Sequence, residues 1–347
     1  MDLENPFPGG IQHFKPPHCP HADCPSRVPG GQPFRYRSRG RFQRRCDRRV
    51  VRRFHCHVCR RSFSVQTFRV DYRLHRPELT APLFDTFVSK VTQRQAARTL
   101  GCTRKTVRHR LLLLAQHSPE FHTAALVRAP SRGALAGPFQ LDELETFERD
   151  RRLRPVTMPL LLEEPSRFIV HVEVAPLPSR GGLSRKHQKR RREMEALEGV
   201  RRSGSREAVK HCFERLASVL RPGALVIIRT DMKSSYVTLL AEVMPGPYRH
   251  ERTSGKEPKD EQNPLWVINH TQAMCRDAAS RLVRRSWGVS KERAWLELHA
   301  WVWVAYRNYI RGFTNKKKRV TAAQLAGVVD RRYTKHSFFE WRVLDAA

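Results

Sequence analysis

Two close pairs of cysteines are the clearest chemical feature of the sequence. Cys19 and Cys24 are separated by four residues, and Cys56 and Cys59 by two. A close pair lets one turn present two thiolates to the same ion, and two such pairs complete the tetrathiolate site that structural zinc prefers. Residues 1–75 are rich in Pro, Arg and Cys and show little helical periodicity. The spacing therefore predicts a zinc-binding basic module in this segment.

Other possible donors leave this ligand set open. Cys46 stands alone, and each nearby histidine is adjacent to, or two residues from, a cysteine, where the geometry of the ring is awkward. We rank these donors below the four cysteines; the histidines are His18, His21, His55 and His57. The remaining cysteines are expected to be core thiols, and they are Cys102, Cys212 and Cys275.

Two aspartates fall on expected strands. Asp142 lies at the centre of PFQLDELETF (138–147), and Asp231 ends the apolar run ALVIIRTD (224–231). A carboxylate in a strand is costly unless it binds something. Acids that face each other can hold two Mg²⁺ ions, which activate the attacking oxygen and stabilise the leaving one in phosphodiester cleavage and transfer. For either aspartate alone, an exposed or turn position is the simpler explanation.

A basic helix expected from residue 268 to 291 supplies the third candidate. Arg276 follows Asn269 by seven residues, or two turns, so both lie on one face. An Asn carbonyl oxygen can ligate Mg²⁺, but it brings no charge and holds the second ion less tightly. Asp277 lies eight residues on, roughly 12 Å along the helix, and cannot take its place. Weaker rivals are Asp260, Glu261 and His270.

The segment 92–114 predicts a helix, a tight turn and a second helix. Gly101 sits where the turn requires a positive φ, and Thr103 is suited to cap the second helix. The apolar contacts between the helices are expected from Ala96, Ala97, Leu100, Val107 and Leu111. The side chains presented to the major groove would be Arg104, Lys105, Arg108 and His109.

The rest of the chain predicts an α/β domain after a linker at 129–138. Its expected elements are β-rich runs at 138–147, 156–164 and 167–175, which could form an antiparallel meander, a helix at 206–220, the strand 224–231 and helices within 269–310. Residues 180–206 carry ten Lys or Arg against three Glu. We interpret them as a flexible basic insertion. The tryptophans near the end of the chain are expected mainly in the core, although Trp287 could stack on a base.

The charge of the chain indicates a polyanionic partner. It has 66 Lys and Arg against 33 Asp and Glu, a formal charge of +33. No basic amphipathic helix, lipidation signal or long apolar span favours a membrane, so nucleic acid is the better partner. Residues 34–61 hold twelve Arg and one Asp, a density that favours phosphate contacts. The N-terminus lacks the apolar run of a signal peptide, and we expect a cytoplasmic chain.

The order of these motifs resembles the DDE transposases of bacterial insertion sequences, of the insertion-sequence-one type. CHVCRRSFS (56–64) looks like the end of that family's zinc module, LDELETF like its first catalytic strand and RTDMKSSY like its second. RLVRRSWGVSK (281–291) is similar to the basic stretch after the third catalytic residue. The resemblance runs from about Cys19 to Arg311, and the insertion at 180–206 is outside the family pattern.

The resemblance implies a multidomain protein. Its parts would be a zinc-binding module at 1–75, a helix-turn-helix domain at 76–128, an α/β ribonuclease H-like catalytic domain at 138–315 and a basic C-terminal tail at 316–347. Carried over by position, Asp142 and Asp231 are the first and second Mg²⁺ or Mn²⁺ ligands. Asn269 stands where the family usually has Glu, and Arg276 matches the basic residue two turns beyond.

The implied function is a transposase that binds the terminal inverted repeats of its element and catalyses strand cleavage and strand transfer on double-stranded DNA. Such an enzyme would act as a homo-oligomer on DNA of the bacterial nucleoid. The main alternative is a sequence-specific DNA-binding protein, derived from a transposase, whose catalytic domain is inactive; Asn269 is the residue that separates the two. A zinc-ribbon nuclease acting on RNA is a third reading, ranked lowest.

Overall fold

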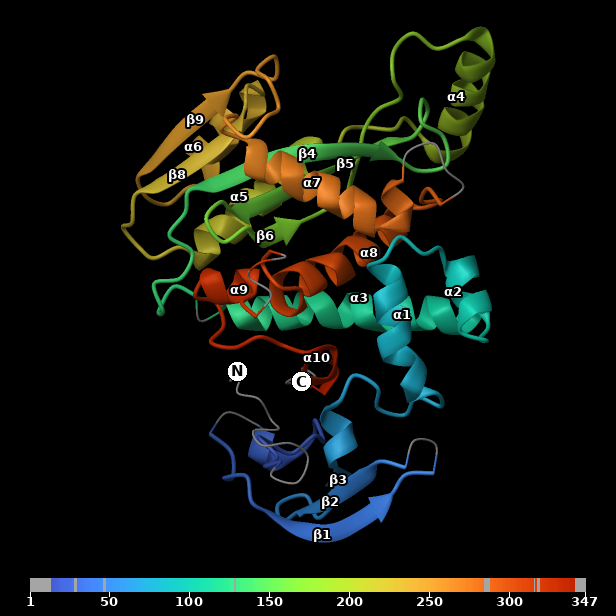
Figure 1. Ribbon diagram of the computed structural model, residues 1–347, viewed down its shortest axis with the longest axis vertical. Helices are drawn as coiled ribbons and strands as arrows, with labels where there is room; N and C mark the ends of the chain where they lie inside the picture. Colours follow the sequence, from blue (N-terminus) through green and yellow to red (C-terminus); the bar gives the residue numbers. More distant parts are fainter. Residues whose placement is uncertain are drawn as a thin grey trace.

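The computed structural model describes residues 14–27, 30–45, 48–127, 129–283, 288–314, 316 and 319–340. Figure 1 shows three tiers: a small sheet formed by the N-terminal segment, a layer of helices, and a larger sheet with its own helices. The predicted combination of a small cysteine-bearing module with a mixed α/β region is confirmed at this level.

The N-terminal sheet is antiparallel and follows the chain order. Its strands are β1 (Tyr36–Gln43), β2 (Val50–Cys56) and β3 (Ser62–Ser64). Its small core is largely aromatic, with Phe14, Phe54, Phe63 and Phe68 packed around buried cysteines. Nearly all of β1 is exposed. Strands were not expected here, because arginines occupy positions where a strand with a buried face would alternate with apolar residues.

The middle layer contains the helix-turn-helix and the end of the chain. Its helices are α1 (Thr80–Phe87), α2 (Gln93–Thr99), α3 (Arg104–Leu126), α8 (Arg293–Ala305) with a π-helical turn at Tyr306–Ile310, α9 (Ala322–Leu325) and α10 (Lys335–Glu340). The long helix α3 packs along α8.

The predicted basic tail at 316–347 is wrong for its described part. Phe338 and Phe339 of α10 are buried in the helical core, and the carbonyl oxygen of Phe338 lies 2.8 Å from Nε2 of His117 on α3. Ala322 and Ala323 are also buried. The prediction rested on the lysines at 316–318, whereas the apolar residues that follow pack in the core of the helical layer.

The larger sheet has the order β6-β5-β4-β8-β9, with β7 paired to β5. The strands are β4 (Phe139–Phe147), β5 (Pro155–Glu163), β6 (Phe168–Val172), β7 (Ala175–Pro176), β8 (Val226–Asp231) and β9 (Tyr248–Thr253). The expected antiparallel meander is confirmed in β4, β5 and β6. Strand β8 is parallel to β4, and β9 is parallel to β8.

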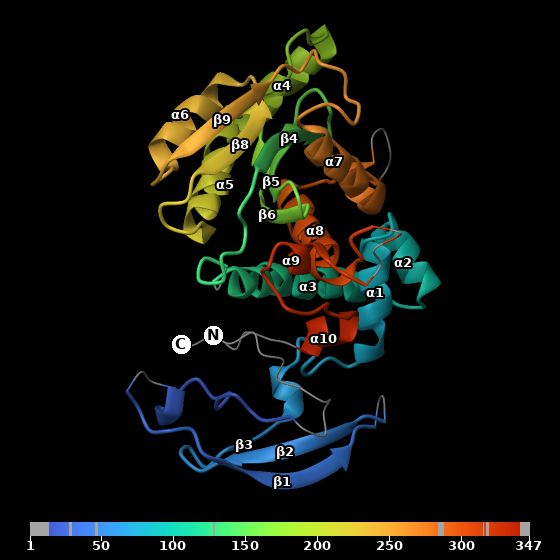
Figure 2. The same cartoon turned by 60° about the vertical axis from the view of Figure 1, so that its left-hand side comes forward.

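Helices cover both faces of this sheet. Helices α5 (Ser205–Val219) and α6 (Ser234–Val243) pack on one face, and α7 (Trp266–Ala278) packs on the other, as Figure 2 shows. Every residue of β5 is consequently buried. The two faces are held by separate apolar clusters, one containing Leu141 and Ile228 and the other Leu144 and Ile268.

The predicted flexible insertion at 180–206 is wrong in its central part, which forms the helix α4 (Arg185–Glu198). The hydroxyl of Ser184 accepts a hydrogen bond from the backbone N–H of His187, and Gly199, with φ of +79°, follows the last turn. None of its residues is buried. The segment is rich in Arg, Lys, Glu, Met and Ala, which have high helix propensity, so it needs no apolar face to become helical.

Candidate metal centres

The four predicted cysteines come together. Cys19 and Cys24 precede the small sheet, Cys56 ends β2, and Cys59 lies in the following turn. Their sulfur atoms all lie within 4.8 Å of one another. The Sγ atoms of Cys19 and Cys59 are 3.7 Å apart, and those of Cys24 and Cys56 are 3.8 Å apart. A tetrahedral ion with Zn–S bonds of about 2.3 Å separates its ligands by about 3.8 Å. The cluster therefore fits a structural Zn²⁺.

The rival donors do not join this cluster among the described residues. His18 packs against the ring of Phe68, with centroids 5.6 Å apart, and burial together with the charge of Arg27 lowers the pKa of His18 to about 4. The rings of His55 and His57 contact each other edge to face. Cys46 lies outside the described residues.

Asp142 and Asp231 lie on adjacent parallel strands and face the same side of the sheet. Gln140 of β4 is paired with Arg229 of β8. Asp142 follows Gln140 by two residues, and Asp231 follows Arg229 by two residues. Side chains two residues apart point to one face. The carboxylate of Glu164 accepts hydrogen bonds from both Gln140 and Arg229, so these side chains, and hence the two aspartates, share a face.

The environment of Asp142 favours a bound cation. Its Oδ1 accepts a hydrogen bond from the backbone N–H of Glu143 (2.8 Å), and its Oδ2 accepts one from Nε2 of Gln272 (3.1 Å). Oδ1 of Asp231 accepts one from the backbone N–H of Lys233 (2.9 Å). Burial raises the pKa of Asp142 above its ordinary value, and the charge of Asp231 raises it further. A divalent ion shared by the two carboxylates would relieve this repulsion.

Helix α7 runs over β4 and brings a residue that the sequence reasoning missed. The backbone N–H of Ile268 donates to Oε1 of Gln140 (2.8 Å), and Gln272, one turn later, reaches Asp142. Nη2 of Arg276 donates to the carbonyl oxygen of Glu145 (3.2 Å). The signal for Gln272 was available, since it is a polar residue on the same helix face as the buried Ile268 and Cys275.

Asn269 lies on α7 three residues before Gln272, about 60° away around the helix. It is half-buried, and its side-chain amide makes no hydrogen bond with the residues that the structure describes. Asp277 is paired with Lys90 (3.2 Å), which agrees with its exclusion as a ligand. His270 stacks on Trp266 with centroids 5.0 Å apart.

Glu143, next to Asp142 in sequence, points to the opposite face of the sheet. Its carboxylate is the partner of Lys233 and accepts hydrogen bonds from the hydroxyls of Tyr236 (2.9 Å) and Ser205 (2.7 Å). Burial would raise the pKa of Glu143, but the bond from Lys233 and the further donors lower it. Its ionised state is thus satisfied inside the fold, unlike that of Asp142.

The helix-turn-helix forms as expected. Ala96, Val107 and Leu111 are buried, Gly101 has φ of +55°, and the hydroxyl of Thr103 accepts a hydrogen bond from the backbone N–H of Thr106 (3.2 Å). The side chains predicted to contact DNA are all exposed, and they are Arg104, Lys105, Arg108 and His109.

Two of these side chains have contacts within the chain. Nδ1 of His109 lies 3.3 Å from Nη1 of Arg110. The guanidinium of Arg108 lies 4.7 Å from the ring centroid of Trp295, at the start of α8. Trp303 is buried, and Trp295 and Trp301 pack against the core, as expected. Residues 284–287 of the predicted basic stretch, including Trp287, lie outside the described residues.

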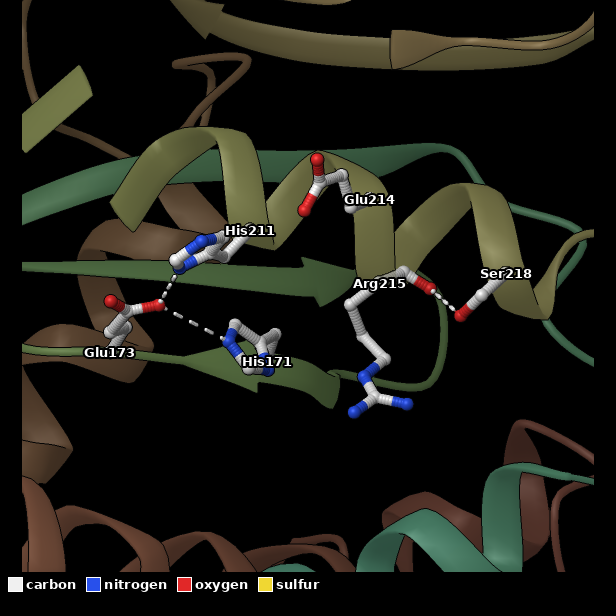
Figure 3. A pocket seen from close by; sticks show the side chains of 6 residues that line it. All are labelled: His171, Glu173, His211, Glu214, Arg215 and Ser218. Atoms are coloured by element: carbon white, nitrogen blue, oxygen red, sulfur yellow. Dashed lines mark hydrogen bonds and ion pairs between the residues drawn. The ribbon is translucent and has the colours of Figure 1, made fainter. Parts of the chain in front are cut away.

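A further polar pocket, of about 380 Å³, lies between β6 and α5. Glu173 is 2.8 Å from Nδ1 of His211 and 3.8 Å from Nε2 of His171, as Figure 3 shows. The carboxylate raises the pKa of His211, and the opposite charges here balance each other. This pocket therefore differs from the aspartate pair, where like charges meet.

No protein-family model and no curated protein matches the chain. Solved structures similar to it include a pre-cleavage Mos1 transpososome, with 14% identity over 66% of this chain and 75% of that chain and a TM-score of 0.19. They also include the Mos1 mariner paired end complex with Mn, with 13% identity over 68% of this chain and 78% of that chain and a TM-score of 0.21. Likeness at these TM-scores establishes neither fold nor function. Within the described part of the chain, every helix is too short or too polar to cross a bilayer.

Proposed function

We propose that the chain is a DNA transposase of the DDE type with a ribonuclease H-like catalytic domain. The observation that carries this proposal is the pair Asp142 and Asp231, which project from adjacent parallel strands toward α7. The sheet, an antiparallel meander continued by two parallel strands, agrees with the ribonuclease H-like expectation. The motif order still favours the insertion-sequence-one type, and the proposed partners are element ends, target DNA and further copies of the chain.

Asp142 and Asp231 would hold Mg²⁺ or Mn²⁺, which when bound activates the attacking oxygen and stabilises the leaving oxygen. Asp142 supplies a carboxylate whose Oδ2 is held in orientation by Gln272. Asp231 supplies a second negative charge at the end of β8. Arg276 secures α7 against the backbone of β4 through Glu145 and so fixes the helix above the two acids.

Asn269 is the proposed third ligand. The family resemblance assigns it this position, and its amide is not engaged by any residue in the described ranges, so its carbonyl oxygen is available to an ion. Gln272 is the competing candidate, because it already touches Asp142. In either case the third ligand is neutral, and the two aspartates carry all the charge of the site.

The other regions would bind DNA but take no part in strand cleavage. Zinc held by the four cysteines would fix the N-terminal sheet, whose strand β1 presents Arg37, Arg39 and Arg41 on its exposed length. The second helix of the helix-turn-helix would read the element end through Arg104 and its neighbours. We propose that the protein works in the cytoplasm, on bacterial nucleoid DNA.

The experiment is a cleavage assay. Zinc-loaded protein is incubated with labelled duplexes that carry the DNA flanking its gene, in Mg²⁺ or Mn²⁺. We expect nicks at the element ends that disappear in Asp142→Ala and Asp231→Ala. Glu145→Gln is the matched control, because Glu145 lies on the same strand but is exposed and paired with Arg180. Cleavage that survives in Asp142→Ala would contradict the proposal.

One observation favours the alternative of an inactive, DNA-binding descendant. Both polar residues that α7 brings near the aspartates, Asn269 and Gln272, are neutral amides, and a neutral ligand holds a metal less tightly. In that case the wild type would bind the element ends with sequence specificity, yet produce no nick in either metal. The same assay therefore separates the two functions.

A further inference from the structure

Arg307 is a buried arginine whose charge is not paired within the described part of the chain. It lies in the π-helical turn after α8 and is 1% exposed, and none of its Nε, Nη1 and Nη2 atoms has a hydrogen-bond partner among the described residues. Arg69, 2% exposed, is by contrast paired with both Asp71 and Glu340. A buried, unpaired charge is strongly destabilising. Such a group calls for a functional explanation, and π-helical turns are frequent at functional sites.

Two further arginines surround Arg307. Arg167, in the turn between β5 and β6, has its guanidinium 5.4 Å from the ring centroid of Phe313, and that of Arg307 lies 6.0 Å from the same ring. Arg311 is one turn beyond Arg307 and contacts the sulfur of Met274 on α7 (3.7 Å). None of the three arginines forms an ion pair with any carboxylate in the described ranges.

The electrostatics of this cluster are uniformly positive. Burial, together with the charges of Arg311 and Arg167, lowers the pKa of Arg307 to about 10, so that it stays protonated at neutral pH. Three cations without a counter-charge attract an anion, and the low dielectric of the site strengthens that attraction.

The cluster lies along one face of α7. Arg167 stacks on Trp266 (5.2 Å), Trp266 stacks on His270, and Arg311 contacts Met274. These α7 residues recur at intervals of four and form one face of the helix. Asn269 borders that face, whereas Gln272 reaches Asp142 from roughly the opposite side of the helix. DNA bound at the three arginines would therefore lie across α7 from the aspartates.

We propose that Arg167, Arg311 and the underlying Arg307 form a phosphate-binding site that holds a backbone phosphodiester of bound DNA. Arg167 and Arg311 are half-buried and can donate directly, in the forked geometry that suits phosphate. Arg307, beneath Phe313, adds its charge from within the fold. The DNA assignment rests on the proposed function, whereas the affinity for phosphate does not.

The first test is thermal unfolding of the zinc-loaded full chain with inorganic phosphate, against chloride at equal ionic strength. Phosphate should raise the melting temperature of the wild type but not of Arg167→Gln or Arg307→Met. Arg307→Met removes an unpaired buried charge, so it should fold with unchanged or higher stability, whereas Arg69→Met should be destabilised. A wild-type phosphate response in Arg307→Met and Arg167→Gln would overturn the site.

The second test measures the affinity for element-end DNA over a range of salt concentrations by fluorescence anisotropy. Arg167→Gln and Arg311→Gln should each lose affinity about tenfold at moderate salt and reduce the salt slope by about one. Arg215→Gln on α5 is the matched control and should change neither. Lost phosphate response with unchanged DNA affinity would overturn the DNA assignment and leave free phosphate as the ligand.

The two proposals fail separately. If Asp142→Ala and Asp231→Ala cleave like the wild type, the proposed catalytic centre is wrong, but the phosphate response still reports on the arginine cluster. If cleavage depends on the aspartates and yet all three arginine variants bind phosphate and DNA normally, the cluster is wrong and the catalytic proposal stands.

Discussion

The N-terminal module with its four cysteines and the α/β domain hold their proposed metal ligands together in opposite ways. In the module, four thiols lie at tetrahedral spacing within a small aromatic core, and β1 is almost entirely exposed. In the α/β domain, helices cover both faces of the sheet and β5 is wholly buried, so the packing of the sheet holds the two aspartates on one face. Folding of the N-terminal sheet should therefore depend on its metal. In the α/β domain, the folded sheet should position the metal site.

Breaking the zinc cluster should have the largest effect. Cys56→Ser, or removal of zinc by a chelator, should unfold the N-terminal sheet, because structural zinc in small domains contributes about 10 to 16 kcal/mol of apparent binding free energy. The larger sheet should persist. Limited proteolysis with mass spectrometry would show cleavage confined to residues before α1. Cys102→Ser, outside the cluster, is the control. An intact N-terminal sheet in metal-free protein would show that this sheet does not depend on zinc.

Neutralising Asp142 should have opposite effects on activity and on stability. Asp142→Asn should abolish cleavage yet raise the melting temperature at neutral pH. The folded-state pKa of Asp142 is raised, so its stability contribution is complete below the unfolded pKa, near 4, and is lost as pH rises through the folded value.

The check is the melting temperature as a function of pH without Mg²⁺. The wild type should lose stability relative to Asp142→Asn as pH increases, and Mg²⁺ should restore it in the wild type alone. Equal pH profiles for both proteins would mean that neither burial nor the charge of Asp231 raises the pKa of Asp142.

The third ligand offers a medium-sized effect. Asn269→Asp should tighten Mg²⁺ binding, by roughly tenfold, because it adds charge to a site served by a neutral amide. Gln272→Glu should instead remove the donor to Asp142, raise the pKa of Asp142 further and destabilise the metal-free protein. Isothermal titration with Mg²⁺ separates them. Tighter binding in Gln272→Glu than in Asn269→Asp would make Gln272 the ligand.

The same contrast explains how far the sequence could be interpreted. The cysteines form two short local pairs, so the metal site could be predicted from their spacing. The helix-turn-helix could be predicted from Gly101, Thr103 and a local apolar pattern. The meander was readable because its strands are apolar. Strand β9 is a polar edge, and α4 has no buried face, so neither carries periodicity. Gln272 acquires its role through Asp142, more than a hundred positions away, and Arg307 acquires its role partly through the similarly distant Arg167.

The pocket of His171, Glu173 and His211 gives the smallest effect, since Glu173 and His211 already pair with each other. Glu173 raises the pKa of His211, so the contribution of His211 to stability is complete below its ordinary value of 6.5 and is lost as pH rises through the raised one. His211→Ala should therefore lower the melting temperature slightly at pH 6 and less at pH 9, because this half-exposed pair is screened by solvent. Tight uptake of a second Zn²⁺ that disappears in His211→Ala would show instead that this pocket, like the cysteine cluster, requires an ion.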